Sequence, residues 1–149
     1  MPMDTQLTTV GNLDPKLASA LCYVPVMSVN LIASAAFFIT EKENRTVRFH
    51  AAQGLLVVGA IIVSAVVFSL LTVLLSVGGG IVDAILGLGG LLSILSSLLV
   101  LLISLVYILA LIGIPFGLAA MAYMEKPARV PMLAGFAERM AGLEAGWND

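Results

Sequence analysis

The polar and apolar positions of the chain fall into long blocks and do not alternate residue by residue. Residues 17–39 form a run of 23 uncharged positions, which at about 1.5 Å per residue is long enough to cross a hydrocarbon core of roughly 30 Å. Asp14 and Pro15 come directly before it. This pair is typical of a helix start, because the carboxylate can cap free backbone N–H groups and proline fits the first turn. We therefore predict a first span over residues 17–39.

Two further apolar blocks follow. Residues 51–77 predict a second span, which we expect to end at the three consecutive glycines of residues 78–80, because residues without side chains favour a break. Residues 84–124 then give 41 uncharged positions. That number is too large for one crossing and just enough for two with almost no turn. The length of this block alone leaves the number of spans open.

The distribution of basic residues favours three spans, because Lys and Arg in short loops stay on the cytoplasmic side during insertion. With three spans, the loop of residues 40–50 and the tail after Met124 share one side and carry six basic residues, against Lys16 alone opposite. With four spans the division is four against three. The predicted organisation is an extracytoplasmic segment 1–16, a membrane domain 17–124 and a cytoplasmic tail 125–149. Within the membrane domain, the three spans lie at about 17–39, 51–77 and 91–122. A Gly-rich interfacial turn is expected at 81–90 and a kink near Pro115. Four spans remain an open alternative.

Composition agrees with an all-α integral membrane protein. Of the 149 residues, 60% are apolar and 11% charged, against about half and about a quarter in soluble domains. Between residues 51 and 124 the ionisable groups are Asp83, Tyr107 and Tyr123. The net charge is -2, and the basic residues lie in two short clusters. This charge pattern does not predict a surface that binds DNA or RNA. We expect the lipid bilayer as partner and a prokaryotic cell (inner) membrane as location.

Two alternatives concern the single cysteine and the first apolar run. Cys22 alone can form neither an intrachain disulfide nor a multi-thiolate metal site. Ala33, Ser34 and Ala35 resemble a signal-peptide cleavage site, but the segment before the run carries two acids and one lysine in place of a basic cluster. We therefore interpret the first run as a retained span.

The loop between the first two spans is polar, short and chemically varied. If Asn44 caps the second helix, Arg45 and Arg48 lie about 60° apart on one sector, with His50 and Gln53 on a neighbouring one. One interpretation is that the cations snorkel to lipid phosphates and set topology. The other is recognition, because paired arginines suit carboxylate or phosphate groups and histidine titrates near neutral pH. The candidate partner- or headgroup-binding residues are Glu41, Lys42, Asn44, Arg45, Arg48, Phe49, His50 and Gln53.

The tail and the last span carry two weaker patterns. Apolar residues of the tail recur at steps of three and four, which predicts one face of an amphipathic helix lying along the cytoplasmic interface or on a partner. Gly113 and Gly117 form a small-xxx-small pair that permits close helix packing. Asp83 is expected to be a solvated or capping carboxylate. The interfacial tail residues are Arg129, Pro131, Leu133, Phe136, Met140, Leu143 and Trp147.

The loop also carries a motif that resembles a known family. It ends in a Val-Arg-Phe-His-Ala-x-Gln element at residues 47–53, with Leu-Cys-Tyr at 21–23 before it and Ala-Tyr at 122–123 and Arg-Val-Pro-Met-Leu at 129–133 after it. Over roughly residues 17–137 the chain resembles the Tic-twenty-like group of small membrane proteins. The resemblance implies an all-helical membrane protein. Plastid relatives belong to the inner-envelope import machinery, some bacterial relatives lie in magnetosome membranes, and most are uncharacterised.

These observations favour a non-catalytic function without cofactor or metal. One histidine and one loop carboxylate supply neither a catalytic constellation nor enough metal ligands. We expect an accessory, assembly or scaffold subunit of a larger membrane complex, which docks through residues 41–53 on an acidic loop or on anionic headgroups. The alternative is a homo-oligomeric, translocon-like pore. Self-association would distinguish the two.

Overall fold

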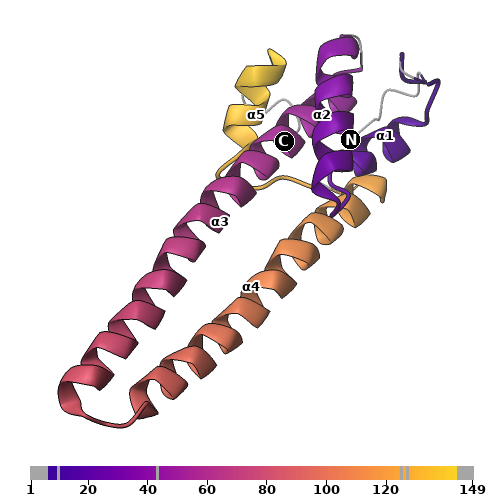
Figure 1. Cartoon of the computed structure of the whole chain (residues 1–149). Helices are drawn as coiled ribbons and strands as arrows, with labels where there is room; N and C mark the ends of the chain where they lie inside the picture. Colours follow the sequence, from indigo (N-terminus) through magenta and orange to yellow (C-terminus); the bar gives the residue numbers. More distant parts are fainter. Residues whose placement is uncertain (1–6, 10, 43, 125, 127, 144–149) are drawn as a thin grey trace. The chain divides into compact units, whose positions relative to one another are not determined.

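The computed structural model describes residues 7–9, 11–42, 44–124, 126 and 128–143. Among these residues the chain is helical and has no strand, as predicted (Figure 1). Two compact units are present: unit 1 comprises Met1–Ala60 and Ile112–Asp149, and unit 2 comprises Ile61–Leu111. The helices are α1 (Pro15–Leu21), α2 (Met27–Thr40), α3 (Arg45–Leu86), α4 (Leu91–Tyr123) and α5 (Ala134–Ala141).

The structure differs from the predicted single span over residues 17–39. The helix starts as expected, with Pro15 in the first turn and the Asp14 carboxylate accepting a hydrogen bond of 2.8 Å from the Lys16 N–H. It ends at Leu21, and a new helix begins at Met27. Pro25 lies between them; proline has no N–H to donate and disfavours helical backbone at the residue before it. The run therefore forms two short helices.

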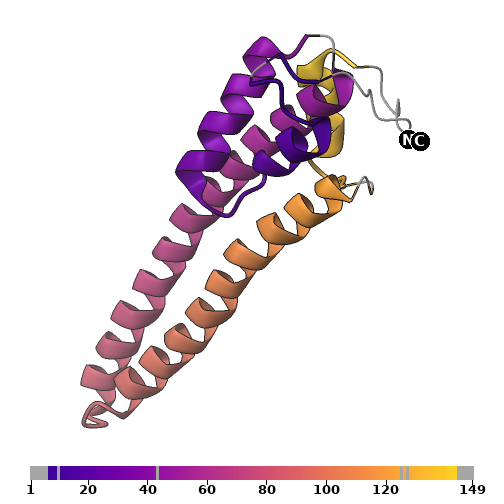
Figure 2. The same ribbon diagram turned by 90° about the vertical axis from the view of Figure 1, so that its right-hand side faces the viewer.

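These two helices, α1 and α2, pack side by side in unit 1 (Figure 2). The backbone N–H and the hydroxyl of Thr9, before α1, both donate to the carboxylate of Glu41, which follows α2. The two ends of this stretch of chain therefore lie together. At 1.5 Å per residue, the 14 residues of α2 rise about 21 Å, short of a bilayer core.

Unit 2 is an antiparallel hairpin of the second part of α3 and the first part of α4 (Figure 1). The predicted break at residues 78–80 does not occur, and α3 continues to Leu86. Gly79 lies against α4, where a Cβ would come within 2.6 Å of the Ser96 hydroxyl oxygen. The missing side chain thus allows the two helices to approach.

The turn of the hairpin is shorter than the predicted segment 81–90. It occupies residues 87–90, where three glycines adopt the left-handed backbone that suits residues without a Cβ. The Asp83 carboxylate accepts from the backbone N–H groups of Gly90 (2.7 Å) and Leu92 (3.1 Å). Asp83 therefore caps the start of α4, so of the two predicted alternatives, a solvated or a capping carboxylate, the structure has the second.

Two of the helices, α3 and α4, are long and apolar enough to cross a membrane, while three spans are not confirmed. The bounds of α4 agree with the predicted 91–122. Of the most apolar 18 residues, 11% in α3 and none in α4 are buried inside the protein. Within unit 2 the hydroxyl oxygens of Ser64 and Tyr107 lie 3.0 Å apart, and the Tyr107 ring stacks on Phe68 at 4.2 Å. Most of the large apolar side chains of the hairpin are exposed, which suits a lipid environment.

The tail helix α5 is shorter than its apolar pattern predicts, and it buries a different face. It ends at Ala141 and is followed by Gly142, whose φ is 68°. The predicted residue Trp147 lies outside the described residues. Leu133 and Leu143 are half-buried, whereas Phe136 and Met140 are exposed. The face that packs against Phe49 and Ala52 of α3 is made of alanines, which let the two backbones come close. These alanines are Ala134, Ala137 and Ala141.

Candidate functional site

The centre of unit 1 is the fully buried amide of Gln53. Its Nε2 donates to the hydroxyl of Tyr23 (3.0 Å) and to the backbone carbonyl of Ala128 (2.8 Å). Its Oε1 accepts from the backbone N–H of Val130 at 3.5 Å. One side chain on α3 thus joins the corner between α1 and α2 to the segment that follows α4. The Ala128 carbonyl and the Val130 N–H together fix which way the amide points.

The Tyr23 hydroxyl continues this network to His50. Its oxygen lies 3.0 Å from Nδ1 of His50, and the two rings meet edge to face at 5.7 Å. The phenol oxygen accepts from Gln53 and has a second lone pair, so it can either donate its own O–H to Nδ1 or accept from it, depending on the tautomer of His50. Because the ring is buried, desolvation disfavours the charged imidazolium and favours a neutral His50. A buried, neutral His50 differs from the surface titrating group considered from the sequence.

A close helix crossing lies beside this network. A Cβ on Gly54 would come within 2.4 Å of the Ser34 hydroxyl oxygen and 2.5 Å of the Cys22 carbonyl oxygen. The Ser34 oxygen itself lies 3.3 Å from that carbonyl and 3.2 Å from Oδ1 of Asn30. Glycine at position 54 thus lets α3 pass against the α1–α2 corner. From the sequence, Tyr23 was noted as part of a family motif and Ser34 as part of a cleavage-site pattern, but neither of them nor Asn30 was predicted as an internal hydrogen-bonding residue. Isolated polar residues in an apolar run were the signal for them.

The predicted tail residue Arg129 is part of the internal structure of unit 1. Its guanidinium forms an ion pair with the buried carboxylate of Glu138 on α5. The same guanidinium lies 6.0 Å from the centre of the Phe49 ring, within cation–π range. Arg129 therefore connects α5 to the start of α3. The neighbouring Pro131 is exposed.

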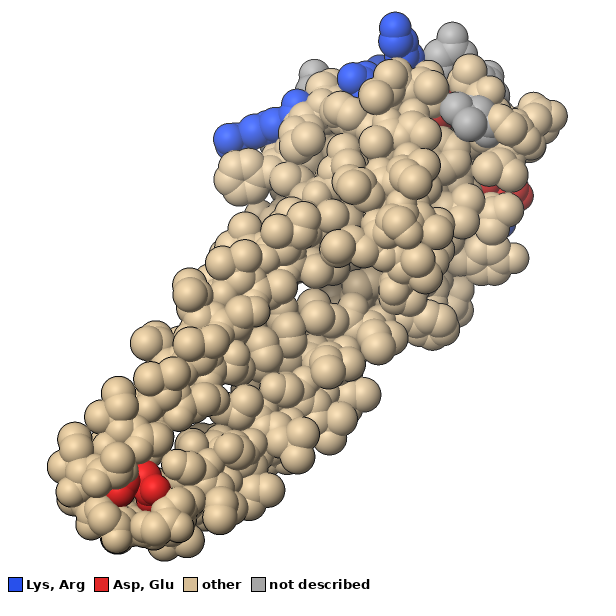
Figure 3. All heavy atoms as spheres, in the orientation of Figure 1, with Lys and Arg blue, Asp and Glu red and all other residues tan. Residues whose placement is uncertain are grey.

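The candidate residues of the loop divide into buried and outward-facing groups. Asn44 caps α3 as predicted, because its Oδ1 accepts from the Val47 N–H at 3.1 Å. Lys42 and Arg45 are exposed, and Arg48 is half-buried with its guanidinium carbon 5.8 Å from the centre of the Phe38 ring. The basic side chains visible in Figure 3 all belong to unit 1, since residues 61–111 contain no Lys or Arg. The remaining candidates are buried: Glu41, Phe49, His50 and Gln53.

Among the described candidate residues of the loop, the side chains that are exposed or half-buried are those of Lys42, Arg45 and Arg48, which we call the basic edge. Among the described residues, Nε of Arg48 is buried without a hydrogen-bond partner. The Arg48 side chain as a whole is half-buried, and the planar fork of a guanidinium suits a planar group with two oxygens, such as a carboxylate.

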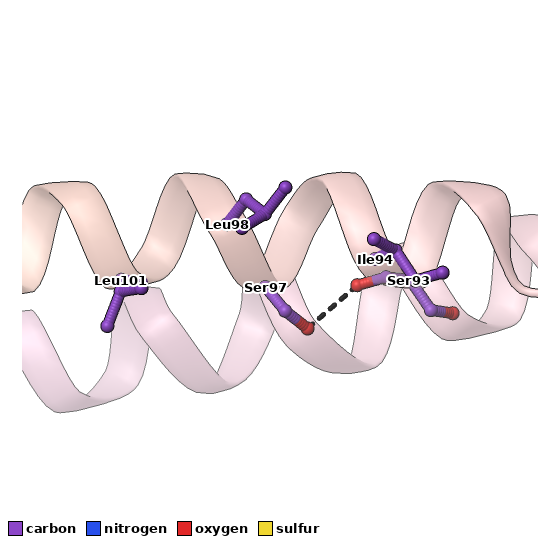
Figure 4. Close-up of a pocket in the computed structure, with 5 residues that line it drawn as sticks. All are labelled: Ser93, Ile94, Ser97, Leu98 and Leu101. Atoms are coloured by element: carbon purple, nitrogen blue, oxygen red, sulfur yellow. Dashed lines mark hydrogen bonds between the residues drawn. The ribbon is translucent and has the colours of Figure 1, made fainter.

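Two other features of α4, a pair of glycines and a shallow pocket, offer few polar groups for binding. A Cβ on Gly113 or Gly117 would meet open space, so this predicted packing pair meets no helix within the described part of the chain. A shallow pocket on α4 is lined by Ser93, Ile94, Ser97, Leu98 and Leu101, and the Ser97 hydroxyl donates back to its own helix at the Ser93 carbonyl (Figure 4). Within the ranges described above, no group of three or more His, Cys, Asp or Glu could hold a metal ion.

Comparison with known proteins gives one informative match. The chain is 34% identical over 62 residues to the UPF0132 membrane protein MJ1443 of Methanocaldococcus jannaschii. The aligned part is 42% of this chain and 52% of the relative, so the chain spans about half the length of the curated relative it matches. No family model matches, and no solved structure does.

The match and the two long apolar helices together support a membrane protein of an uncharacterised family. The comparisons show no link to the Tic-twenty-like group, so that resemblance stays a prediction. The predicted lack of catalytic activity likewise stays a prediction.

Proposed function

We propose that this chain is a non-catalytic accessory, assembly or scaffold subunit of a larger membrane complex. In this proposal the basic edge binds an acidic segment of a partner protein. The single observation behind it is the division of the loop: its histidine and glutamine are engaged inside unit 1, while Lys42, Arg45 and Arg48 face outward. Buried polar networks fix the positions of the elements that carry them.

The location follows from the same surface. In this proposal the basic edge lies on the cytoplasmic side of a prokaryotic inner membrane, and its support is the tendency of short basic segments to remain there during insertion. The outward apolar face of α5, with Phe136 and Met140, would lie along the adjoining interface. Anionic headgroups are the competing ligand for the basic edge.

Purification in mild detergent from cells that express the tagged chain at its natural level tests the proposal. We expect unrelated chains to co-purify, as identified by mass spectrometry. Arg48→Lys keeps the charge but loses the planar fork, so it should reduce recovery of the partner several-fold, and Arg45→Glu should abolish it. Arg139→Glu is the matched control, because Arg139 is an exposed arginine on α5 outside the basic edge.

Membrane insertion of every variant is measured alongside. Full recovery of the partner with Arg45→Glu would contradict the docking role. If anionic lipid co-purifies in place of protein, and is lost with the same variants, the edge is a headgroup site and the accessory role is rejected.

A homo-oligomeric, protein-conducting component is the second candidate function. The observation that favours it is the open space beside Gly113 and Gly117 on α4, since such a pair lets a second copy's helix approach closely. A stable homo-oligomer without other chains in the same purification, disrupted by Gly117→Leu, would support this function over the first.

A further inference from the structure

The two ends of the α1–α2 stretch meet at Glu41. Its carboxylate accepts from both the N–H and the hydroxyl of Thr9, and such bonds require donor and acceptor within about 3.5 Å. A segment that crossed a membrane once would hold its ends roughly 30 Å apart. Residues 9 and 41 therefore lie on the same side of any membrane that the chain enters.

The helices between these ends are too short to cross. The seven residues of α1 and the 14 of α2 rise about 10 Å and about 21 Å. Each could reach only part of the way into a hydrocarbon core of roughly 30 Å. The corner between them, residues 22–26, is then the deepest point of this stretch.

The surface of the stretch is apolar at and near that corner. No Lys, Arg, Asp or Glu lies between Lys16 and Glu41. Val26 and Met27 at the corner are each more than half exposed, and Ile32 on α2 is 68% exposed. Apolar surface that is continuous over this length is typical of contact with lipid or protein.

The corner also leaves few polar groups to solvate. The N–H groups of Tyr23 and Val24 donate to the carbonyls of Ala20 and Leu21, and Pro25 has no N–H. The Cys22 carbonyl lies 3.3 Å from the Ser34 hydroxyl oxygen, and the Tyr23 side chain is bonded inside the protein. Non-helical backbone at membrane depth needs such internal partners.

We infer that α1 and α2 form a re-entrant hairpin, which inserts its corner among the acyl chains of one leaflet and returns to the side it came from. The chain then crosses the membrane twice, by α3 and α4. The segment before α1, the basic edge and the tail share one side, and residues 87–90 lie on the other.

The charge distribution agrees with this topology better than with three spans. Lys16 joins the other basic residues, so that all seven Lys and Arg lie on one side and none on the other. The three-span topology predicted from the sequence divides them six to one and places residues 1–16 opposite the loop. The positive-inside rule therefore favours the re-entrant arrangement and puts both ends of the described chain in the cytoplasm.

Cysteine labelling of the full chain in membrane vesicles of both orientations tests the inference. Single cysteines are introduced at exposed positions that carry no charge, and a membrane-impermeant maleimide is applied from each side. The parental chain, whose Cys22 is buried, serves as the blank, with Cys22→Ser as the background if that thiol reacts. The reporter variants are Leu7→Cys, Thr40→Cys, Leu88→Cys and Met132→Cys.

We expect Leu7→Cys, Thr40→Cys and Met132→Cys to react from one side, and Leu88→Cys only from the other. Reaction of Leu7→Cys and Thr40→Cys from opposite sides would overturn the inference, because the stretch between them would then cross the membrane.

A fifth variant tests contact with lipid. Residue 27 is exposed on the protein, so only lipid can shield a cysteine there from the reagent. In membranes we therefore expect Met27→Cys to react, from either side, at less than a tenth of the rate of Met132→Cys. In SDS it should react fully. Labelling in membranes as fast as at position 132 would show that the corner is in water and would also overturn the inference.

Discussion

Nε2 of Gln53 donates a hydrogen bond of 2.8 Å to the backbone carbonyl of Ala128, 75 residues further along the chain. The same amide also bonds to Tyr23, which lies 30 residues before it. Three segments that are remote in sequence are thus held by one side chain that has no access to solvent. The stability of unit 1 should therefore depend on this amide more than on any single apolar contact around it.

Replacing the amide tests this dependence. Gln53→Leu has similar bulk but leaves the Ala128 carbonyl and the Val130 N–H without their partner. An unpaired buried polar group costs about 1–3 kcal/mol, so we expect the free energy of unfolding to fall by at least that amount. Thermal unfolding in detergent micelles measures the change. The control is Thr40→Val, which removes an exposed hydroxyl and should change stability by less than about 0.5 kcal/mol.

Two glycines of α3 should respond in opposite ways to the same substitution. Gly54→Ala places a methyl group within 2.5 Å of the Cys22 carbonyl, whereas Gly59→Ala meets nothing within 4 Å. We expect the first to destabilise unit 1 by about 1–3 kcal/mol through overpacking. The second should be neutral or stabilising by up to about 1 kcal/mol, because alanine favours helix. Equal unfolding temperatures for the two variants would refute the close crossing at position 54.

The ion pair between Arg129 and Glu138 should hold α5 in place. Glu138→Ala removes the carboxylate and leaves the guanidinium beside Phe49 without this anion. Breaking a buried pair is costly, although the 23% exposure of the Arg129 side chain reduces the effect to about 1–3 kcal/mol. Hydrogen exchange over residues 134–141 should rise at least tenfold. The double variant Arg129→Met, Glu138→Leu should restore much of the protection, and unchanged exchange in Glu138→Ala would show that the alanine face alone holds α5.

The hairpin turn offers a separate test in unit 2. Asp83→Ala removes the acceptor for the N–H groups of Gly90 and Leu92, and loss of such a cap costs about 1 kcal/mol. Asp83→Asn keeps one side-chain oxygen and should retain about half of the stabilisation. Unfolding of the purified chain in increasing SDS measures both. Because Asp83 lies in unit 2, neither variant should alter partner recovery through the basic edge.

Sequence reasoning succeeded where the deciding interaction is local. Three helix caps are made by residues no more than nine positions from the N–H groups that they bind, namely Asp14, Asn44 and Asp83. Capping residues so close to a helix start can be predicted from the sequence. The bounds of α4 followed from its unbroken apolar run and the glycines before it.

It failed where distant residues decide. The run 17–39 passes every length criterion for a span, yet Pro25 and the pairing of Tyr23 with Gln53 divide it. The glycines at 78–80 predict a break, but Gly79 faces Ser96 on the other arm of the hairpin, so helix packing overrides the local preference. For α5, the large apolar residues predicted a face for lipid or a partner, whereas the contact with α3 is made by the small alanines of another face.

The partners of Gln53 have a consequence for how the protein is made. The chain leaves the ribosome from its amino end, so Tyr23, His50 and Gln53 exist long before residues 128–130 do. Until then the amide of Gln53 has its first partner but not its last two. Unit 1 is therefore completed only after residues 128–130 have been synthesised. A chain that stops before residue 128 lacks two of the three partners of the Gln53 amide, so we expect its unit 1 to be less stable than that of the longer chain.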